Sequence, residues 1–479
     1  MFFNSLSFLI FFPLVVLIYF IIPRKVRYIW LLIASYYFYM SWNVKFVFLI
    51  LFTTLVSYLA AILIEKKDDK SYKKVVLGVS AILCLGVLFV FKYFNFISES
   101  FTSFVSLFSI HLEPLTLKLL LPVGISFYTF QTLSYVIDVY RGNVPAEHHF
   151  GYYAAFVSFF PQLVAGPIER TNNLLPQIKA THNFDYSKAT YGLKLMTWGF
   201  FKKIVVADTI SRYVNHIYGS PQKFSGFVLI LATIFFSVQI YCDFSGYSDI
   251  AVGTAKLFGI DLMTNFKSPY FSQSIKEFWG RWHISLSSWL KDYVYIPLGG
   301  NRVGKIRHYF NLIVTFLVSG LWHGANWTYV VWGAIHGFLQ VTENIIFPNI
   351  KLKQSKIIIC LRVIFVFILC SFAWIFFVSN SIDDAIYVIK NLFDGISSPL
   401  EYLANGFINL DITKLDLISI VVSSTVLAVY DYVSLTKDVI AAISSKKVII
   451  RWAIYCLFVL WVILRIPSNS SPEFIYFQF

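Results

Sequence analysis

The sequence predicts an all-α polytopic membrane protein, and three observations lead to this fold class. Only 13% of the 479 residues are charged, whereas a soluble protein carries roughly 25%. Hydrophobic residues make up 58% of the chain and aromatic residues 19%, with a mean hydropathy of +0.69. Apolar runs long enough to cross a bilayer, about 20 residues each, recur along the chain. Soluble globular, disordered and secreted disulfide-rich proteins are therefore excluded.

The apolar runs predict about 11 to 13 spanning helices, arranged as a bundle that also contains re-entrant helices. The weakest candidate is 189–206, because Lys202 and Lys203 interrupt it. Residues 381–413 mix short apolar stretches with charges and predict an interfacial amphipathic helix with a loop. The other candidates are 5–22, 28–44, 46–64, 75–91, 115–137, 150–168, 226–242, 309–321, 326–347, 356–379, 416–433 and 448–464.

Two basic clusters fix the expected orientation. One follows the first apolar run and the other follows the third, so placing both in the cytoplasm puts the N-terminus outside. We interpret the net charge of +14 as this positive-inside bias together with attraction to anionic lipid headgroups, and not as a nucleic-acid surface. The clusters are Arg24, Lys25 and Arg27, and Lys66, Lys67, Lys70, Lys73 and Lys74.

Residues 265–308 fit neither a spanning helix nor a free loop. The stretch is rich in Lys and Arg, yet Trp282, Trp289, Tyr293 and Tyr295 lie among the charges. Irregular or short-helical backbone at membrane depth is tolerated only where protein or a water-filled cavity surrounds it. We therefore expect re-entrant helices on the cytoplasmic side that line a cavity.

The first candidate for chemistry is His323, which lies at the break between two apolar segments. Gly320 and Gly324 allow close backbone approach, and Trp322 and Trp327 supply apolar walls. A neutral imidazole in such a pocket can act as a general base near neutral pH. The alternative is a histidine that is hydrogen-bonded for packing only.

A second histidine, His283, lies in the re-entrant stretch, and on a helix it would share a face with Ser287 four residues later. For His336, in the following apolar segment, packing is the favoured role. We expect no metal site, because the spacing of His283 and His323 matches no local ligand pattern and no Cys or acidic residue adjoins them. The five cysteines show no paired spacing, so no disulfide framework is expected.

Two further polar clusters occur at the ends of apolar segments. In 239–249, Asp243 and Tyr247 can orient a histidine or hold the re-entrant backbone, and support of the backbone is favoured. The same role is expected of the Pro/Gly-broken stretch 161–167 with Glu169 and Arg170.

These motifs together resemble the bacterial alginate O-acetyltransferase branch of the membrane-bound O-acyltransferase family. The resemblance is specific over about residues 1–350, and related branches acetylate peptidoglycan or D-alanylate teichoic acid. It implies a bundle around a central tunnel, with a catalytic region at about 265–325. In this region the resemblance makes His323 the catalytic histidine and places His283 at a second motif position, which is His or Asn across the superfamily. The motifs are 122–130, 160–168, 241–249, 278–289 and 320–327.

The resemblance further implies acyl transfer from a cytoplasmic thioester to a hydroxyl of an extracellular or cell-wall polysaccharide. The expected donor is acetyl-CoA or an acyl carrier protein thioester, and no bound cofactor is expected. The expected partner is an extracytoplasmic SGNH-type acyltransferase or esterase, and the expected location is a bacterial cell membrane. We expect Arg302 and Lys305 to attract the anionic donor, with Trp282, Trp322 and Asn326 as supporting residues. One alternative is D-alanyl transfer to teichoic acid; another is a transporter, although the chain lacks the paired halves common in transporters.

The tail 467–479 is expected to follow a membrane domain of residues 1–466 and to lie outside the cell. Its last six residues have the pattern Phe-x-Tyr-x-x-Phe, which resembles the C-terminal motif of the small partner protein in the D-alanylation system. The resemblance implies that Tyr476 carries the acyl group. A phenol has a pKa of about 10, so such a relay needs a base like His323. The alternative is an aromatic anchor at the membrane interface.

Overall fold

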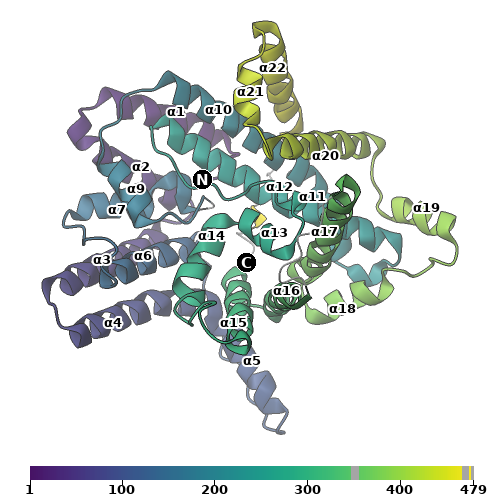
Figure 1. Ribbon diagram of the computed structural model, residues 1–479, viewed down its shortest axis with the longest axis horizontal. Helices are drawn as coiled ribbons and strands as arrows, with labels where there is room; N and C mark the ends of the chain where they lie inside the picture. Colours follow the sequence, from purple (N-terminus) through teal and green to yellow (C-terminus); the bar gives the residue numbers. More distant parts are fainter. Residues whose placement is uncertain (165, 347–354, 467–473, 476–479) are drawn as a thin grey trace. The chain divides into compact units, whose positions relative to one another are not determined.

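The computed structural model describes residues 1–164, 166–346, 355–466 and 474–475 (Figure 1). The regular structure of these residues is helical, in agreement with the predicted all-α fold class. Contacts between residues divide the chain into two compact units. The first contains residues 1–196 and 250–263, and the second contains residues 197–249 and 264–479.

The first unit is built from the N-terminal helices. α3, α4 and α6 contact one another, and α2 contacts α7, so the hydrophobic core of this unit lies between these helices (Figure 1). The helices are α1 (Leu6–Ile21), α2 (Arg27–Met40), α3 (Val47–Lys66), α4 (Lys70–Leu88), α5 (Phe94–Ser106), α6 (Ile125–Tyr140), α7 (Phe150–Ser158), α8 (Phe160–Leu163), α9 (Thr171–Lys179) and most of α10 (Tyr186–Phe200).

Two predicted spanning segments of this unit are shorter or broken in the structure. The segment predicted at 115–137 becomes helical only at Ile125, because Gly124 has a left-handed backbone with φ of 75°. A Cβ at Gly124 would lie 2.6 Å from the Leu163 carbonyl oxygen, so only glycine fits this turn. The segment predicted at 150–168 is divided at Phe159 into α7 and the short α8.

The second unit carries the remaining helices. α12 (Phe227–Leu257) begins in this unit and ends in the first one, and a π-helical turn, Phe201–Ala207, joins α10 to α11 (Asp208–Tyr218). The others are α13 (Ile275–Arg281), α14 (Ile284–Leu290), α15 (Lys305–His323), α16 (Trp327–Ile346), α17 (Lys356–Val378), α18 (Ile382–Asn391), α19 (Pro399–Asn409), α20 (Lys414–Ser434), α21 (Val439–Ser444) and α22 (Val448–Arg465).

Glycines bring α15 and α16 into close contact. A Cβ at Gly320 would lie 2.2 Å from the Tyr329 carbonyl oxygen, and one at Gly333 would lie 2.3 Å from the Phe316 carbonyl oxygen. Small residues at helix crossings allow the two backbones to approach. Since His323 is the last residue of α15, this crossing fixes where its side chain lies.

Six of the described helical segments are long and apolar enough to cross a membrane by length and composition. The other predicted segments in the described residues are shorter, broken or more polar, so fewer helices meet this criterion than the 11 to 13 expected. The weak segment 189–206 is helical and passes through the π-helical turn. Residues 381–413 form two short helices, α18 and α19, instead of one. The candidate spans are 44–66, 70–106, 227–257, 356–378, 414–434 and 448–465.

Candidate active site

His323 ends α15 in a pocket of aromatic rings. The residue is 3% exposed, and its ring lies 5.0 Å from that of Trp332 on α16 and 5.3 Å from that of Phe377 on α17. Gly324 follows it, and a Cβ there would lie 2.1 Å from the Tyr329 ring. The adjacent Trp322 ring, at 5.0 Å, completes the apolar walls around the imidazole, whereas Trp327, the other wall expected from the sequence, is exposed.

His283 lies directly before α14 with a left-handed backbone, φ 43° and ψ 53°. This conformation costs a non-glycine residue about 1–2 kcal/mol, and such strain is typical of functional sites. Asn265 holds the turn, because its carbonyl oxygen accepts from the Ile284 N–H at 2.9 Å and its side-chain oxygen accepts from the Ser285 N–H at 3.3 Å. The loop before α13 therefore supports the strained backbone.

The two histidines lie close together in the second unit. Their ring centroids are 6.4 Å apart, and the His283 ring is 5.7 Å from that of Trp322. His283 is fully buried, and burial lowers the pKa of its imidazole to about 3. His283 is therefore neutral at physiological pH and lies outside the candidate spans.

Trp322 and Trp332 lie against this histidine pair, and further tryptophans continue the aromatic cluster toward His336. The Trp282 ring is buried and lies 5.1 Å from that of Trp374. The Trp279 indole N–H donates to His336 Nδ1 at 3.3 Å, and His336 is fully buried. This bond fits the packing role that the sequence favours for His336.

Two predicted supporting residues bond to the local backbone. The Ser287 hydroxyl donates to the Trp282 carbonyl oxygen at 3.2 Å. Because His283 is left-handed and not helical, the expected helical face shared with Ser287 does not form. Asn326 donates to the Asn380 carbonyl oxygen at 3.0 Å, and its side-chain oxygen accepts from the Thr328 N–H at 3.0 Å, so it supports the start of α16.

Asp243, on α12, belongs to a buried ionic cluster. Lys203 Nζ lies 2.7 Å from Asp243 Oδ1 and 2.8 Å from Asp208 Oδ1. The Lys203 and Asp243 side chains are 1% and 4% exposed. Gly246 allows α12 to approach the π-helical turn, since a Cβ there would lie 2.8 Å from the Gly199 carbonyl oxygen. Helices with π turns are frequent at functional sites.

Lys203 is a residue whose role the sequence reasoning missed. In the sequence Lys202 and Lys203 only interrupt an apolar segment, although ionisable groups in such segments are functional candidates. Lys202 also has a carboxylate partner, at 2.6 Å from Asp249 Oδ2. The pairing with Asp208 and Asp243 depends on the π-helical turn, which no local pattern in the sequence indicates.

The described residues of the C-terminal tail contact this cluster. Phe474 is fully buried and Ile475 is 4% exposed. The Phe474 ring lies 4.3 Å from that of Tyr247, and the Ile475 N–H donates to Asp243 Oδ2 at 2.8 Å. Tyr476, the predicted acyl carrier, lies outside the described residues.

Phe244 connects the tail contact to the histidines. Its ring lies 5.9 Å from that of Phe474 and 4.6 Å from that of His283. The described tail residues, Asp243 and His283 therefore belong to one continuous set of contacts within the second unit.

Arg302 and Lys305 are exposed near the start of α15. Lys305 and His323 are the first and last residues of this helix, so about 27 Å of helix separates them at 1.5 Å per residue. Any contribution of this basic surface to donor binding is therefore made at the end of α15 remote from the histidines.

Glu169, expected to support the broken stretch 161–167, instead links α9 to residue 263 within the first unit. The buried carboxylate accepts from the Asn173 amide at 2.6 Å and from the Met263 N–H. Burial raises the pKa of Glu169 to about 7. Within the described residues, no group of three His, Cys, Asp or Glu side chains is arranged to hold a metal ion.

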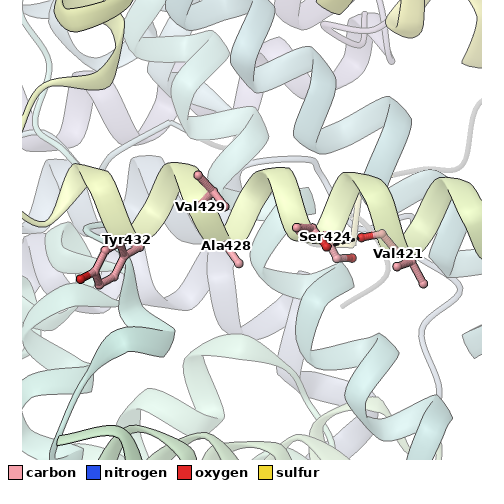
Figure 2. A pocket seen from close by; sticks show the side chains of 6 residues that line it. Val421, Ser424, Ala428, Val429 and Tyr432 are labelled. Carbon is pink, nitrogen blue, oxygen red and sulfur yellow. Dashed lines mark hydrogen bonds between the residues drawn. The ribbon is translucent and has the colours of Figure 1, made fainter. Parts of the chain in front are cut away.

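A shallow groove of about 550 Å³ lies along α20 (Figure 2). None of the predicted site residues lines it. Because α20 is a candidate span, we interpret this apolar face as a lipid-contacting surface. The lining residues are Val421, Ser424, Thr425, Ala428, Val429 and Tyr432.

Comparisons with known proteins agree with the predicted resemblance. Residues 144–381 match the model of the membrane-bound O-acyltransferase family. The chain is 36% identical over 500 residues to a probable alginate O-acetylase AlgI of Pseudomonas putida, with 100% of both chains covered. It is 35% identical over 410 residues to a peptidoglycan O-acetyltransferase of Helicobacter pylori, covering 80% of this chain and 77% of the relative.

A more distant relative transfers a different acyl group. The chain is 31% identical over 258 residues to a teichoic acid D-alanyltransferase of Streptococcus thermophilus, covering 50% of this chain and 62% of that protein. The full-length similarity to O-acetylating relatives and the apolar helices lead to one conclusion. The chain belongs to the membrane-bound O-acyltransferase family and is a multi-pass membrane enzyme that transfers acyl groups to oxygen.

Proposed function

We propose that this enzyme moves an acetyl group from a cytoplasmic thioester to Tyr476 and then to an extracellular or cell-wall polysaccharide. The observation that carries the proposal is the burial of Phe474 against Tyr247, with the Ile475 N–H bonded to Asp243. A mere interfacial anchor would not need these buried contacts. The residue that follows Ile475 in the chain is Tyr476.

In the first step His323 acts as the general base. It takes the proton of the Tyr476 phenol, whose ordinary pKa is about 10, while the phenolic oxygen attacks the thioester carbonyl carbon. The C–S bond then breaks, and the departing thiolate takes the proton from the imidazolium. The products are an acetyl-tyrosine ester and a free thiol, and His323 is neutral again.

In the second step the ester is consumed outside. A hydroxyl of the acceptor attacks the ester carbonyl carbon, the bond to the tyrosine oxygen breaks, and the proton of the hydroxyl ends on that oxygen. A phenolate leaves more readily than an alkoxide because the phenol is the stronger acid. The acyl-tyrosine therefore keeps enough transfer potential for a second acceptor outside the cell.

The role of His283 in this scheme is to position the reactants. It is neutral because it is buried, and its ring lies 6.4 Å from that of His323. Holding donor carbonyl and nucleophile in attack geometry supplies a large part of the rate enhancement in such reactions. A rigid, strained backbone at His283 suits that task.

The donor is acetyl-CoA or a carrier-protein thioester that approaches the basic surface of Arg302 and Lys305 from the cytoplasm. Two relatives with extensive coverage are O-acetylating proteins by name, whereas the D-alanyltransferase matches half of this chain. This difference favours acetyl over D-alanyl transfer. An extracytoplasmic SGNH-type protein is the proposed receiver that passes the acetyl group to the polysaccharide.

The proposed topology places both termini outside the bacterial cell membrane, with residues 1–466 as the acyltransferase domain. Arg465, at the end of α22, is held by Asp416 at 2.6 Å. From Arg465 to Tyr476 an extended chain reaches about 36 Å, compared with a hydrocarbon core of about 30 Å. The tail is therefore long enough to enter a site within the membrane and to withdraw from it.

The proposal is tested with Tyr476→Phe, which keeps the aromatic ring and removes only the hydroxyl. We expect purified wild-type enzyme and acetyl-CoA to yield acetyl on Tyr476 by mass spectrometry, and cells with the variant to lose polysaccharide acetylation. Tyr432→Phe, at an exposed tyrosine of α20, is the matched control and should be normal. Normal acetylation with Tyr476→Phe contradicts the relay, and labelling only by a D-alanyl carrier-protein thioester favours the teichoic acid alternative.

A further inference from the structure

We propose that Asp243 is a positioning residue that holds the C-terminal segment by its main chain during acyl transfer. This inference rests on the proposed function, because it concerns how the acyl-carrying tail is held near the histidines. It assigns to Asp243 a more specific task than support of the re-entrant backbone.

The two carboxylate oxygens of Asp243 have different partners. Oδ1 lies 2.7 Å from Lys203 Nζ, and Oδ2 accepts from the Ile475 N–H at 2.8 Å. Both Asp243 and Ile475 are buried. Hydrogen bonds to an ionised acceptor are stronger than neutral ones, so this contact is well suited to hold the peptide segment at Ile475.

Asp243 benefits from a second hydrogen-bond donor because Lys203 also pairs with another carboxylate. Its single positive charge is shared with Asp208, at 2.8 Å. A buried carboxylate is costly unless its charge is paired and its oxygens accept hydrogen bonds. The Ile475 N–H supplies such a bond, so docking of the tail stabilises the cluster, and withdrawal of the tail leaves Oδ2 without this donor. The bond to Ile475 therefore favours the docked state.

The side-chain contacts of the same segment direct it toward the histidines. The Phe474 ring lies against Tyr247 and Phe244. Phe244 in turn lies 4.6 Å from the His283 ring. A segment fixed at Phe474 and Ile475 is thus one aromatic ring away from His283.

A main-chain contact makes a distinctive prediction for position 475. The bond needs the N–H and is indifferent to the side chain, so Ile475→Ala keeps it and Ile475→Pro removes it. Both substitutions shorten the side chain. In single-turnover reactions of full-length enzyme with acetyl-CoA, we expect Ile475→Pro to acetylate Tyr476 about tenfold or more slowly than Ile475→Ala.

A double-mutant comparison separates positioning from a merely structural role of Asp243. Asp243→Asn removes the charge and leaves Lys203 paired with Asp208. If Asp243 acts through the Ile475 N–H, this change slows Tyr476 acetylation strongly in the Ile475→Ala protein and little in the Ile475→Pro protein. An equal loss in both backgrounds contradicts the proposal.

Docking is also measured without chemistry. Hydrogen exchange of the Ile475 amide should be slow in the wild-type protein and faster in Asp243→Asn, and equal exchange overturns the main-chain contact. Failure of the proposed function looks different: Tyr476 is then not acetylated in the wild-type enzyme, whatever the exchange rates are. If the wild-type enzyme acetylates Tyr476, and the Ile475→Ala and Ile475→Pro proteins do so at equal rates, the relay stands and the role of Asp243 is refuted.

Discussion

The second unit contains two buried regions with opposite physical character. His283 and His323 are surrounded by aromatic rings from α12, α15, α16 and α17, whereas Lys203 is held between two carboxylates. Burial in this apolar region keeps the His283 imidazole neutral. Paired charges instead resist displacement, because breaking one pair leaves another charge buried. In the proposed mechanism the aromatic region therefore supplies the base and positions the reactants, and the ionic region holds the C-terminal segment.

The largest effect is expected at His323. Replacing it with Ala removes the proposed general base, which is worth about 100-fold or more in rate, and should leave the helix crossing at Gly320 unchanged. Acyl transfer by the purified variant should be lost while its gel-filtration profile in detergent stays normal. Retained acyl transfer would show that His323 in the aromatic region is not the base.

The next effect concerns stability and the ionic region. Lys203→Met leaves Asp208 and Asp243 without their shared cation, and breaking a buried pair in this way costs about 3–5 kcal/mol. We expect a clear fall in the thermal midpoint of the purified protein. Lys223→Met, at an exposed lysine, is the control and should change little; similar midpoints for both variants would show that the cluster is not structural.

His283 allows a sharper separation of activity from stability. Its left-handed backbone suits glycine, so His283→Gly should be about 1 kcal/mol more stable than His283→Ala. Both variants lack the imidazole and should be similarly slow. Thermal unfolding and single-turnover rates are measured together, and activity that follows stability in the two variants would make His283 a packing residue only.

The smallest effect is expected at the exposed basic surface. Reversing the charge of Arg302 and Lys305 should raise the KM for the anionic donor a few-fold at low salt, with a smaller change at high salt. The rate at saturating donor should be unchanged. A KM that is insensitive to both the substitution and the salt concentration would exclude this surface from donor attraction.

The sequence predicts those parts of the fold that are determined within a single segment. Apolar length locates α1, α3, α17 and α22 to within a few residues, because spanning a bilayer is a property of one segment. The predicted segments 115–137 and 150–168 differ from the structure because a packing contact between Gly124 and Leu163 decides the turn there.

The same distinction applies to the site. The Gly/Trp break marks His323 in the sequence, since its neighbours are adjacent residues. The left-handed backbone of His283 depends on Asn265, and the pairing of Asp243 depends on Lys203 across a π-helical turn. These contacts join distant residues, so no local pattern indicates them.

Transfer through Tyr476 is tested most directly by a pulse–chase with isotopically labelled acetyl-CoA. If the relay operates, label appears on Tyr476 before any reaches the acceptor, and a chase of unlabelled donor with acceptor present moves it from the tyrosine to the polysaccharide. His323→Ala should prevent the first of these events. Label that reaches the acceptor at the wild-type rate without passing through Tyr476 would contradict the proposed mechanism.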